Sequence, residues 1–346
     1  MNPHAKLLSS ASLMLGTTIT ISSNHWVMAW TGLEINTLAI IPLISKPHHP
    51  RAIEAAIKYF LVQAAASALV LFSSLVNAWF TGQWDITQLN HPTSCLLLTT
   101  AIAMKLGLVP FHFWFPEVLQ GSSLTTALLL STVMKLPPIT ILFLTSHSLN
   151  PTLLTTMAIA SAALGGWMGL NQTQLRKILA FSSISHLGWM TIIMTYNPKL
   201  TLLTFYLYSL ITITVFLTLT KTKALKLSTM MTSWTKIPIL NATFMLTLLS
   251  LAGLPPLTGF LPKWLIIQEL TKQELTTAAT IITMLSLLSL FFYLRLAYYS
   301  TITLPPNSTN HMKQWHINKP TNTTIAILAS LSILLLPLPP MILTII

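Results

Sequence analysis

Residues 105–121 read KLGLVPFHFWFPEVLQG, and residues 253–264 read GLPPLTGFLPKW. The two stretches share residues at a constant offset of 146 positions, at Gly107/Gly253, Leu108/Leu254, Pro110/Pro256 and Pro116/Pro262. Each stretch interrupts a long apolar segment, and proline removes a backbone donor and bends a helix. Free backbone groups at membrane depth are tolerated only where they are buried in protein or line a wet cavity. The sequence therefore predicts two broken transmembrane helices at equivalent points of an internal repeat.

The composition surrounding these stretches is that of an integral membrane protein. Of 346 residues, 53% are hydrophobic and 7% are charged, whereas soluble domains carry about 25% charged residues. A window of about nineteen residues predicts eleven apolar helices in a single all-α membrane domain. They lie near 5–22, 26–45, 60–80, 96–115, 122–144, 150–170, 178–196, 200–220, 240–268, 275–298 and 323–345.

The eleven segments predict two repeats of five helices, 5–144 and 150–298, followed by the final segment 323–345. Each repeat has its broken helix in fourth place. Because five is odd, two consecutive repeats must have opposite orientations in the membrane. Inverted repeats with paired broken helices are typical of proteins that move ions or substrates.

Basic residues predict the orientation of the bundle. Of eighteen Lys and Arg, the connections on the N-terminal side hold thirteen and the opposite side holds two, Lys199 and Lys272. By the positive-inside rule the N-terminus faces the compartment of synthesis, and the C-terminus faces the other side. The basic residues are too few and too scattered for a nucleic-acid-binding face. The single cysteine, Cys95, excludes internal disulfides and iron–sulfur ligation within this chain.

Three ionisable residues fall in the middle of apolar segments: Glu34, Lys105 and Lys135. A fourth, Lys263, follows the second break. A charge at the bilayer centre costs about 2.5–3.5 kcal/mol on insertion scales. A structural ion pair between Glu34 and Lys105 is one explanation, but one glutamate cannot neutralise three lysines. Proton exchange along these groups is the other explanation.

The same stretches carry a family resemblance. Residues 105–121, with LLSTVMK at 129–135, WTGLEIN at 30–36, RKILAFSSISHLG at 176–188 and the second break, resemble the antiporter-like subunits of respiratory complex I. The resemblance covers essentially the whole chain. It implies a proton-moving subunit in the membrane arm of a mitochondrial inner-membrane NADH:ubiquinone oxidoreductase. It also implies that the first three helices of the fourteen-helix bacterial pattern are absent, that the N-terminus faces the matrix and that the C-terminus faces the intermembrane space.

Site residues carry over by position. The resemblance implies that Glu34 is the channel glutamate, that Lys105 is its partner, and that Lys135 connects the half-channels. Lys263 matches the lysine of the second broken helix, and the candidate links of the hydrated axis are His112 and His186. The structural alternative for each histidine is a hydrogen-bonded packing residue.

The resemblance further implies that this chain binds no cofactor or metal. FMN, iron–sulfur clusters and ubiquinone would belong to other subunits. Its partners would be lipid and other membrane-arm subunits, including further antiporter-like chains, with no nucleic acid. Two alternative functions remain at this point: a free-standing cation/proton antiporter, and a purely structural membrane subunit.

Overall fold

The structure is a computed structural model that describes residues 3–45, 49–233, 238–301 and 323–335. Helices dominate these ranges, which contain two isolated β-bridges and no β-strand. The helices are α1 (Pro3–Ser22), α2 (Trp26–Ile44), α3 (Pro50–Thr81), α4 (Pro92–Leu106), α5 (Trp114–Gly121), α6 (Leu124–Ser131), the 3-10 turn η1 (Val133–Lys135), α7 (Leu136–Leu144), α8 (Pro151–Gly169), α9 (Leu175–Ile193), α10 (Pro198–Thr222), α11 (Leu227–Ser233), α12 (Pro238–Ala252), α13 (Phe260–Lys272), α14 (Thr276–Thr301) and α15 (Thr323–Leu334).

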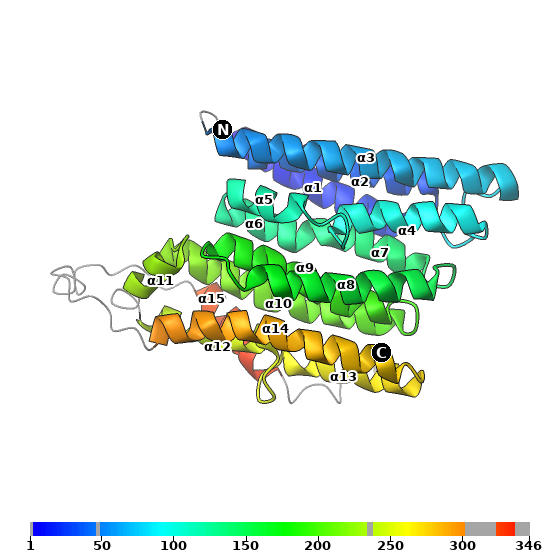
Figure 1. Cartoon of the computed structure of the whole chain (residues 1–346). Helices are drawn as coiled ribbons and strands as arrows, with labels where there is room; N and C mark the ends of the chain where they lie inside the picture. Colours follow the sequence, from blue (N-terminus) through cyan, green and yellow to red (C-terminus); the bar gives the residue numbers. More distant parts are fainter. Residues whose placement is uncertain (1–2, 46–48, 234–237, 302–322, 336–346) are drawn as a thin grey trace.

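Most helices lie side by side in one bundle, in approximate chain order from α3 at one edge to α12, α13 and α14 at the other (Figure 1). Within the described ranges, six spans are long and apolar enough to cross a membrane: α2, α3, the run α6–η1–α7, α8, α10 and α14. Three shorter helices, α4, α12 and α15, are also apolar. The chain is therefore an all-α membrane protein, as the composition predicts.

Both predicted helix breaks are confirmed. Helix α4 ends at Leu106 and α5 begins at Trp114, while α12 ends at Ala252 and α13 begins at Phe260. Each break starts with a glycine in the left-handed region, at φ 76° for Gly107 and φ 82° for Gly253. Glycine adopts this conformation without the steric cost that a Cβ would impose. The 146-residue offset thus holds for the helix ends as well as for the sequence.

Other boundaries differ from the prediction. Helix α3 begins at Pro50, because proline fits the first helical position, so Lys58 lies inside a helix and not in a connection. The segment 122–144 is divided by η1 just before two consecutive prolines, which cannot supply the amides that a continuous α-helix needs. The end of the last predicted segment lies outside the described residues, as do the basic residues Lys46, Lys236, Lys313 and Lys319.

Hydrogen bonds identify connections that share an end of the bundle. At one end, the amide of Trp26 donates to the carbonyl of Trp84 at 3.1 Å, which joins the α1–α2 connection to the α3–α4 connection. At the other end, the amide of Leu175 donates to the carbonyl of Leu225 at 3.2 Å, and the guanidinium of Arg176 donates to the carbonyl of Ser122. The N-terminus and α11 lie at the same side of the bundle in Figure 1.

Close helix packing depends on small residues. A Cβ at Gly188 of α9 would lie 2.5 Å from the hydroxyl of Ser161 and 2.7 Å from the carbonyl oxygen of Ala158 on α8. A Cβ at Gly165 of α8 would lie 2.8 Å from the amide nitrogen of Ser185 on α9. Membrane helices associate largely through such backbone approach, because lipid and side chains are equally apolar. The α8–α9 contact therefore tolerates no side chain at these glycines.

Replacing Gly188 with Ala should lower the free energy of unfolding by about 1–3 kcal/mol, the usual cost of overpacking. The reason is that the two helix backbones must separate to admit the methyl group. Denaturation of the purified protein in detergent, followed by circular dichroism, measures the effect. Thr156→Ala, at an exposed position of α8, is the control and should leave stability almost unchanged. Equal stability of the two variants would contradict this account.

Candidate functional site

Two of the predicted lysines line the same cavity. It has room for water and is lined by Lys105 from α4 and Lys135 from η1. Its polar lining also includes Asn36, Tyr59 and Gln63. The side chains of Lys105 and Lys135 are 6% and 3% exposed. Neither ammonium has a hydrogen-bond partner within the described part of the protein. The cavity is therefore lined by two lysines whose amino groups make no hydrogen bond or ion pair in the described chain.

Glu34 lies on α2, two residues before Asn36, and interacts electrostatically with Lys105. No ion pair within 4.0 Å joins these two residues in the described chain. One carboxylate oxygen of Glu34 is buried without a hydrogen-bond partner, as are both amide atoms of Asn36. Buried polar groups are almost always satisfied by protein or ordered water. The carboxylate of Glu34 and the ammonium of Lys105 thus lie beyond ion-pair distance of each other.

Lys135 has aromatic neighbours where an ion pair would otherwise be expected. Its ammonium lies 4.7 Å from the ring centroid of Phe115 and 5.5 Å from that of Tyr208. A cation over an aromatic face is stabilised by the ring quadrupole, more strongly when it is desolvated. The aromatic rings can stabilise a buried ammonium, and no carboxylate of the described residues contacts it to bind the proton more tightly. Tyr208, on α10, also places the cation beside the second half of the chain.

A second cavity lies beside Tyr208, the tyrosine whose ring is near Lys135. It too has room for water, and it is lined by Tyr208, His186, Trp189, Ser250 and Lys263 among others. The rings of His186 and Tyr208 lie 5.4 Å apart, and Nε2 of His186 lies 3.4 Å from the hydroxyl of Tyr293. Tyr208 therefore lines the second cavity, and its ring centroid lies 5.5 Å from the ammonium of Lys135 and 5.4 Å from the ring centroid of His186.

Lys263 lies in the first turn of α13 and reaches back across the second break. Its ammonium donates to the carbonyl of Ala252, the last residue of α12, at 2.8 Å. It also lies 5.7 Å from the ring centroid of Trp189. The last carbonyls of a helix carry partial negative charge and lack intrahelical partners. Lys263 thus caps α12 and faces the second cavity with the same group.

His112 is buried at 1% exposure inside the first break, and it lines neither of the two cavities. Its ring nitrogens have no hydrogen-bond partner among the described residues, and its nearest ring neighbour is Phe113, at 4.2 Å. The structure thus gathers Lys105 with Lys135, and His186 with Lys263. It does not bring His112 into either group.

Several polar residues in or near the two cavities were not predicted from the sequence. Tyr208 and Tyr293 are 4% and 0% exposed, and their hydroxyls bring polarity into the bundle interior. Tyr208 is in the middle of an apolar segment, which is the available signal, but tyrosine is too common in membrane proteins to single it out. The sequence offered a clearer indication for Asn36, because a polar amide two residues after a buried glutamate is unusual in an apolar helix.

Metal ligands do not cluster here: no group of three His, Cys, Asp or Glu in the described ranges could hold an ion. The ionisable groups that do gather are lysines, a glutamate and a histidine. Such groups exchange protons, and those in the two cavities are buried and lie beside water-sized space.

Comparison with known proteins identifies the family. The profile described as "NADH:quinone oxidoreductase/Mrp antiporter, TM" matches residues 23–289, and "NADH dehydrogenase subunit 2 C-terminus" matches residues 290–343. NADH-ubiquinone oxidoreductase chain 2 of Struthio camelus is 82% identical over 343 residues and is covered over 99% of both chains. The same chain of Gallus gallus is 78% identical over 344 residues, again with 99% of each covered.

Solved structures agree in fold. A chain of respiratory complex I from Thermus thermophilus is 26% identical with a TM-score of 0.84, over 98% of this chain and 80% of that one. A chain of the Mrp complex from Dietzia, 18% identical, shares the fold with a TM-score of 0.76, over 85% of this chain and 60% of that one. The profiles, the relatives and the fold agree, and the chain belongs to the family of NADH-ubiquinone oxidoreductase chain 2, whose transmembrane region is built like that of the Mrp antiporters.

Proposed function

We propose that this chain is a membrane-arm subunit of respiratory complex I that moves protons across the mitochondrial inner membrane. The proposed relay runs from Glu34 and Lys105 through Lys135 and His186 to Lys263. One observation carries this proposal. Two buried lysines whose ammonium groups make no hydrogen bond or ion pair in the described chain line one cavity with room for water, and a second such cavity is lined by Tyr208, His186 and Lys263.

Electrostatics in this site favours proton movement. Coulomb interactions scale inversely with the dielectric constant, so like charges repel far more strongly in a protein interior than in water. Two charged ammonium groups that line one cavity would repel each other, so we propose that a proton gained by Lys105 favours proton loss from Lys135. Glu34 acts on Lys105 with the opposite sign. A change in the position or protonation of Glu34 would thus alter the proton affinity of Lys105 and, through Lys105, that of Lys135.

Water and aromatic groups would complete the path. Each cavity has room for water, and a water molecule can bridge polar groups that are too far apart for a direct hydrogen bond. Tyr208 and Tyr293 contribute hydroxyls near His186, and Asn36 contributes an unpartnered amide near Lys105. His112 remains a candidate link from the first break, although it lines neither cavity.

The proposal includes the finer architecture: about eleven membrane crossings in two inverted repeats, 5–144 and 150–298. The shared ends of the bundle support the inversion. Helix α2 starts at the end of the bundle where its first residue bonds to Trp84 in the α3–α4 connection. Helix α9, its counterpart in the second proposed repeat, starts at the opposite end, where Arg176 donates to the carbonyl of Ser122. Counterparts that run in opposite directions are what a two-fold axis in the membrane plane requires. We place the N-terminus in the matrix and the C-terminus in the intermembrane space, as the basic residues predict.

Redox chemistry would belong to other subunits, so we propose no cofactor on this chain. FMN, iron–sulfur clusters and ubiquinone would lie elsewhere in the complex, and further antiporter-like subunits would be neighbours in the membrane arm. The gap between Glu34 and Lys105 argues against a merely structural ion pair. A free-standing antiporter has no observation in its favour beyond a fold that both classes share.

The orientation can be measured with cysteines. Asp85 and Lys223 are exposed in connections that we place on opposite sides, and the native Cys95 is only 7% exposed. In mitoplasts with intact inner membranes, a membrane-impermeant maleimide should label Asp85→Cys directly. It should label Lys223→Cys only after the membrane is opened, because that loop faces the matrix. Labelling of both from the same side would overturn the topology.

The relay predicts the effect of removing one cation. Lys105→Ala should lower NADH-driven proton transfer by about tenfold, which corresponds to about 1.4 kcal/mol on the limiting barrier. The complex should still assemble, because the variant removes a buried charge that has no ion-pair partner. Proton uptake by proteoliposomes and native electrophoresis measure the two properties. Lys272→Ala, at an exposed lysine of α13, is the control. Normal proton transfer in an assembled Lys105→Ala complex would refute the relay.

A further inference from the structure

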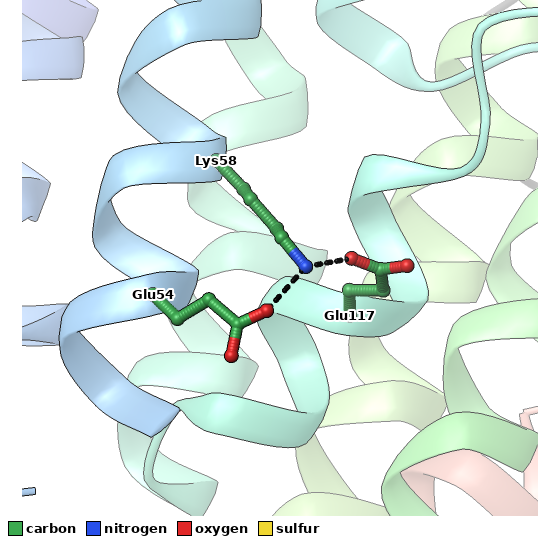
Figure 2. Close-up of polar contacts among 3 residues, drawn as sticks. All are labelled: Glu54, Lys58 and Glu117. Atoms are coloured by element: carbon green, nitrogen blue, oxygen red, sulfur yellow. Dashed lines mark hydrogen bonds and ion pairs between the residues drawn. The ribbon is translucent and has the colours of Figure 1, made fainter. Parts of the chain in front are cut away.

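Lys58 joins two helices through a pair of carboxylates. Its ammonium lies 2.5 Å from Oε1 of Glu54 and 2.6 Å from Oε2 of Glu117 (Figure 2). Glu54 is one turn earlier on α3, whereas Glu117 is on α5. The other ion pair of the described residues, Lys272 with Glu269, lies within α13. Lys58–Glu117 is thus the ion pair that connects separate helices in the described part of the chain.

Helix α5 needs such a connection. The break at residues 107–113 separates it from α4, and with eight residues it is too short to be stable in isolation. Glu117 lies in its first turn, where a negative charge is favoured by the helix dipole. At its other end, a Cβ at Gly121 would lie 2.6 Å from both the Cβ of Ala55 and the carbonyl oxygen of Arg51. Helix α5 is therefore held against α3 at both ends.

The same short helix carries walls of the first cavity. Phe115 supplies the ring that lies 4.7 Å from the ammonium of Lys135. Trp114 donates from Nε1 to the carbonyl of Met104 at 3.1 Å and lies edge-on to Tyr59, with 5.8 Å between ring centroids. Tyr59 directly follows Lys58 in α3 and lines the cavity. A shift of α5 along α3 would therefore move the groups that surround both buried lysines.

We infer that Lys58 is a positioning residue: by binding Glu117, it fixes α5 so that Phe115 and Trp114 keep their places beside Lys135 and the end of α4. Glu54 directs the lysine toward Glu117 from one turn away on the same helix. This inference rests on the proposed proton relay. The side chains of Lys58 and Glu117 are 42% and 52% exposed, and exposed ion pairs add little to global stability. The effect of Lys58 is therefore on local geometry.

The test uses assembled complex from cells that carry Lys58→Met, Lys58→Arg, Glu117→Gln or Lys105→Ala. Lys58→Met and Glu117→Gln should each lower NADH-driven proton transfer in proteoliposomes by about threefold, since small misplacements of a reacting group are costly. Hydrogen–deuterium exchange should rise in residues 114–121. Lys58→Arg should retain most of the transfer, because arginine can bind both carboxylates. The control is Lys272→Met, which breaks an ion pair inside one helix and should change neither property.

The outcomes separate this inference from the relay itself. Normal transfer in Lys58→Met and Glu117→Gln, with transfer lost in Lys105→Ala, would overturn the positioning role and leave the relay standing. Normal transfer in Lys105→Ala would overturn both. Equal losses in Lys58→Met and Lys58→Arg, or a reduced amount of assembled complex in Lys58→Met and Glu117→Gln, would indicate a general structural role and would also overturn the inference.

Discussion

A helix that ends inside a membrane exposes carbonyl groups that lipid cannot satisfy, and this constraint shapes both halves of the protein. Each break solves it with a side chain from the half-helix that follows. The indole of Trp114 donates to Met104, and the ammonium of Lys263 donates to Ala252. Because those donors must reach back across the break, α5 and α13 are held close to the ends of α4 and α12. The cavities form beside these crossings.

Aromatic groups take the place of counter-ions around the buried cations. Lys135 lies over Phe115 and Tyr208, and Lys263 lies near Trp189. A carboxylate in contact with either lysine would hold its proton tightly in a medium of low dielectric. An aromatic face stabilises the cation less, so the energies of the charged and neutral forms stay closer. This environment is consistent with the proposed relay, in which these lysines gain and lose a proton.

Two positions that the proposed repeats would make equivalent carry opposite charges. Glu117 and Lys263 both lie in the first turn of the helix that follows a break, 146 residues apart. Glu117 faces outward and binds Lys58 of α3, whereas Lys263 faces inward to a cavity and to the end of α12. One half-helix is therefore fixed by an ion pair at the surface, and the other by the same lysine that serves the proposed site. The shared framework supports two different uses.

The sequence alone determined the helical membrane class, the positions of both breaks, and the residues whose charge the membrane should exclude. These follow from local chemistry: hydropathy, the missing amide of proline, the freedom of glycine, and the cost of burying a charge. Only the tertiary structure decided that Lys105 shares a cavity with Lys135, that Tyr208 shares another with His186 and Lys263, and that His112 lines neither. It also moved Lys58 from a connection into α3, opposite Glu117. Such pairings depend on how helices far apart in the chain pack against one another, and no local pattern encodes which faces of two apolar helices will meet.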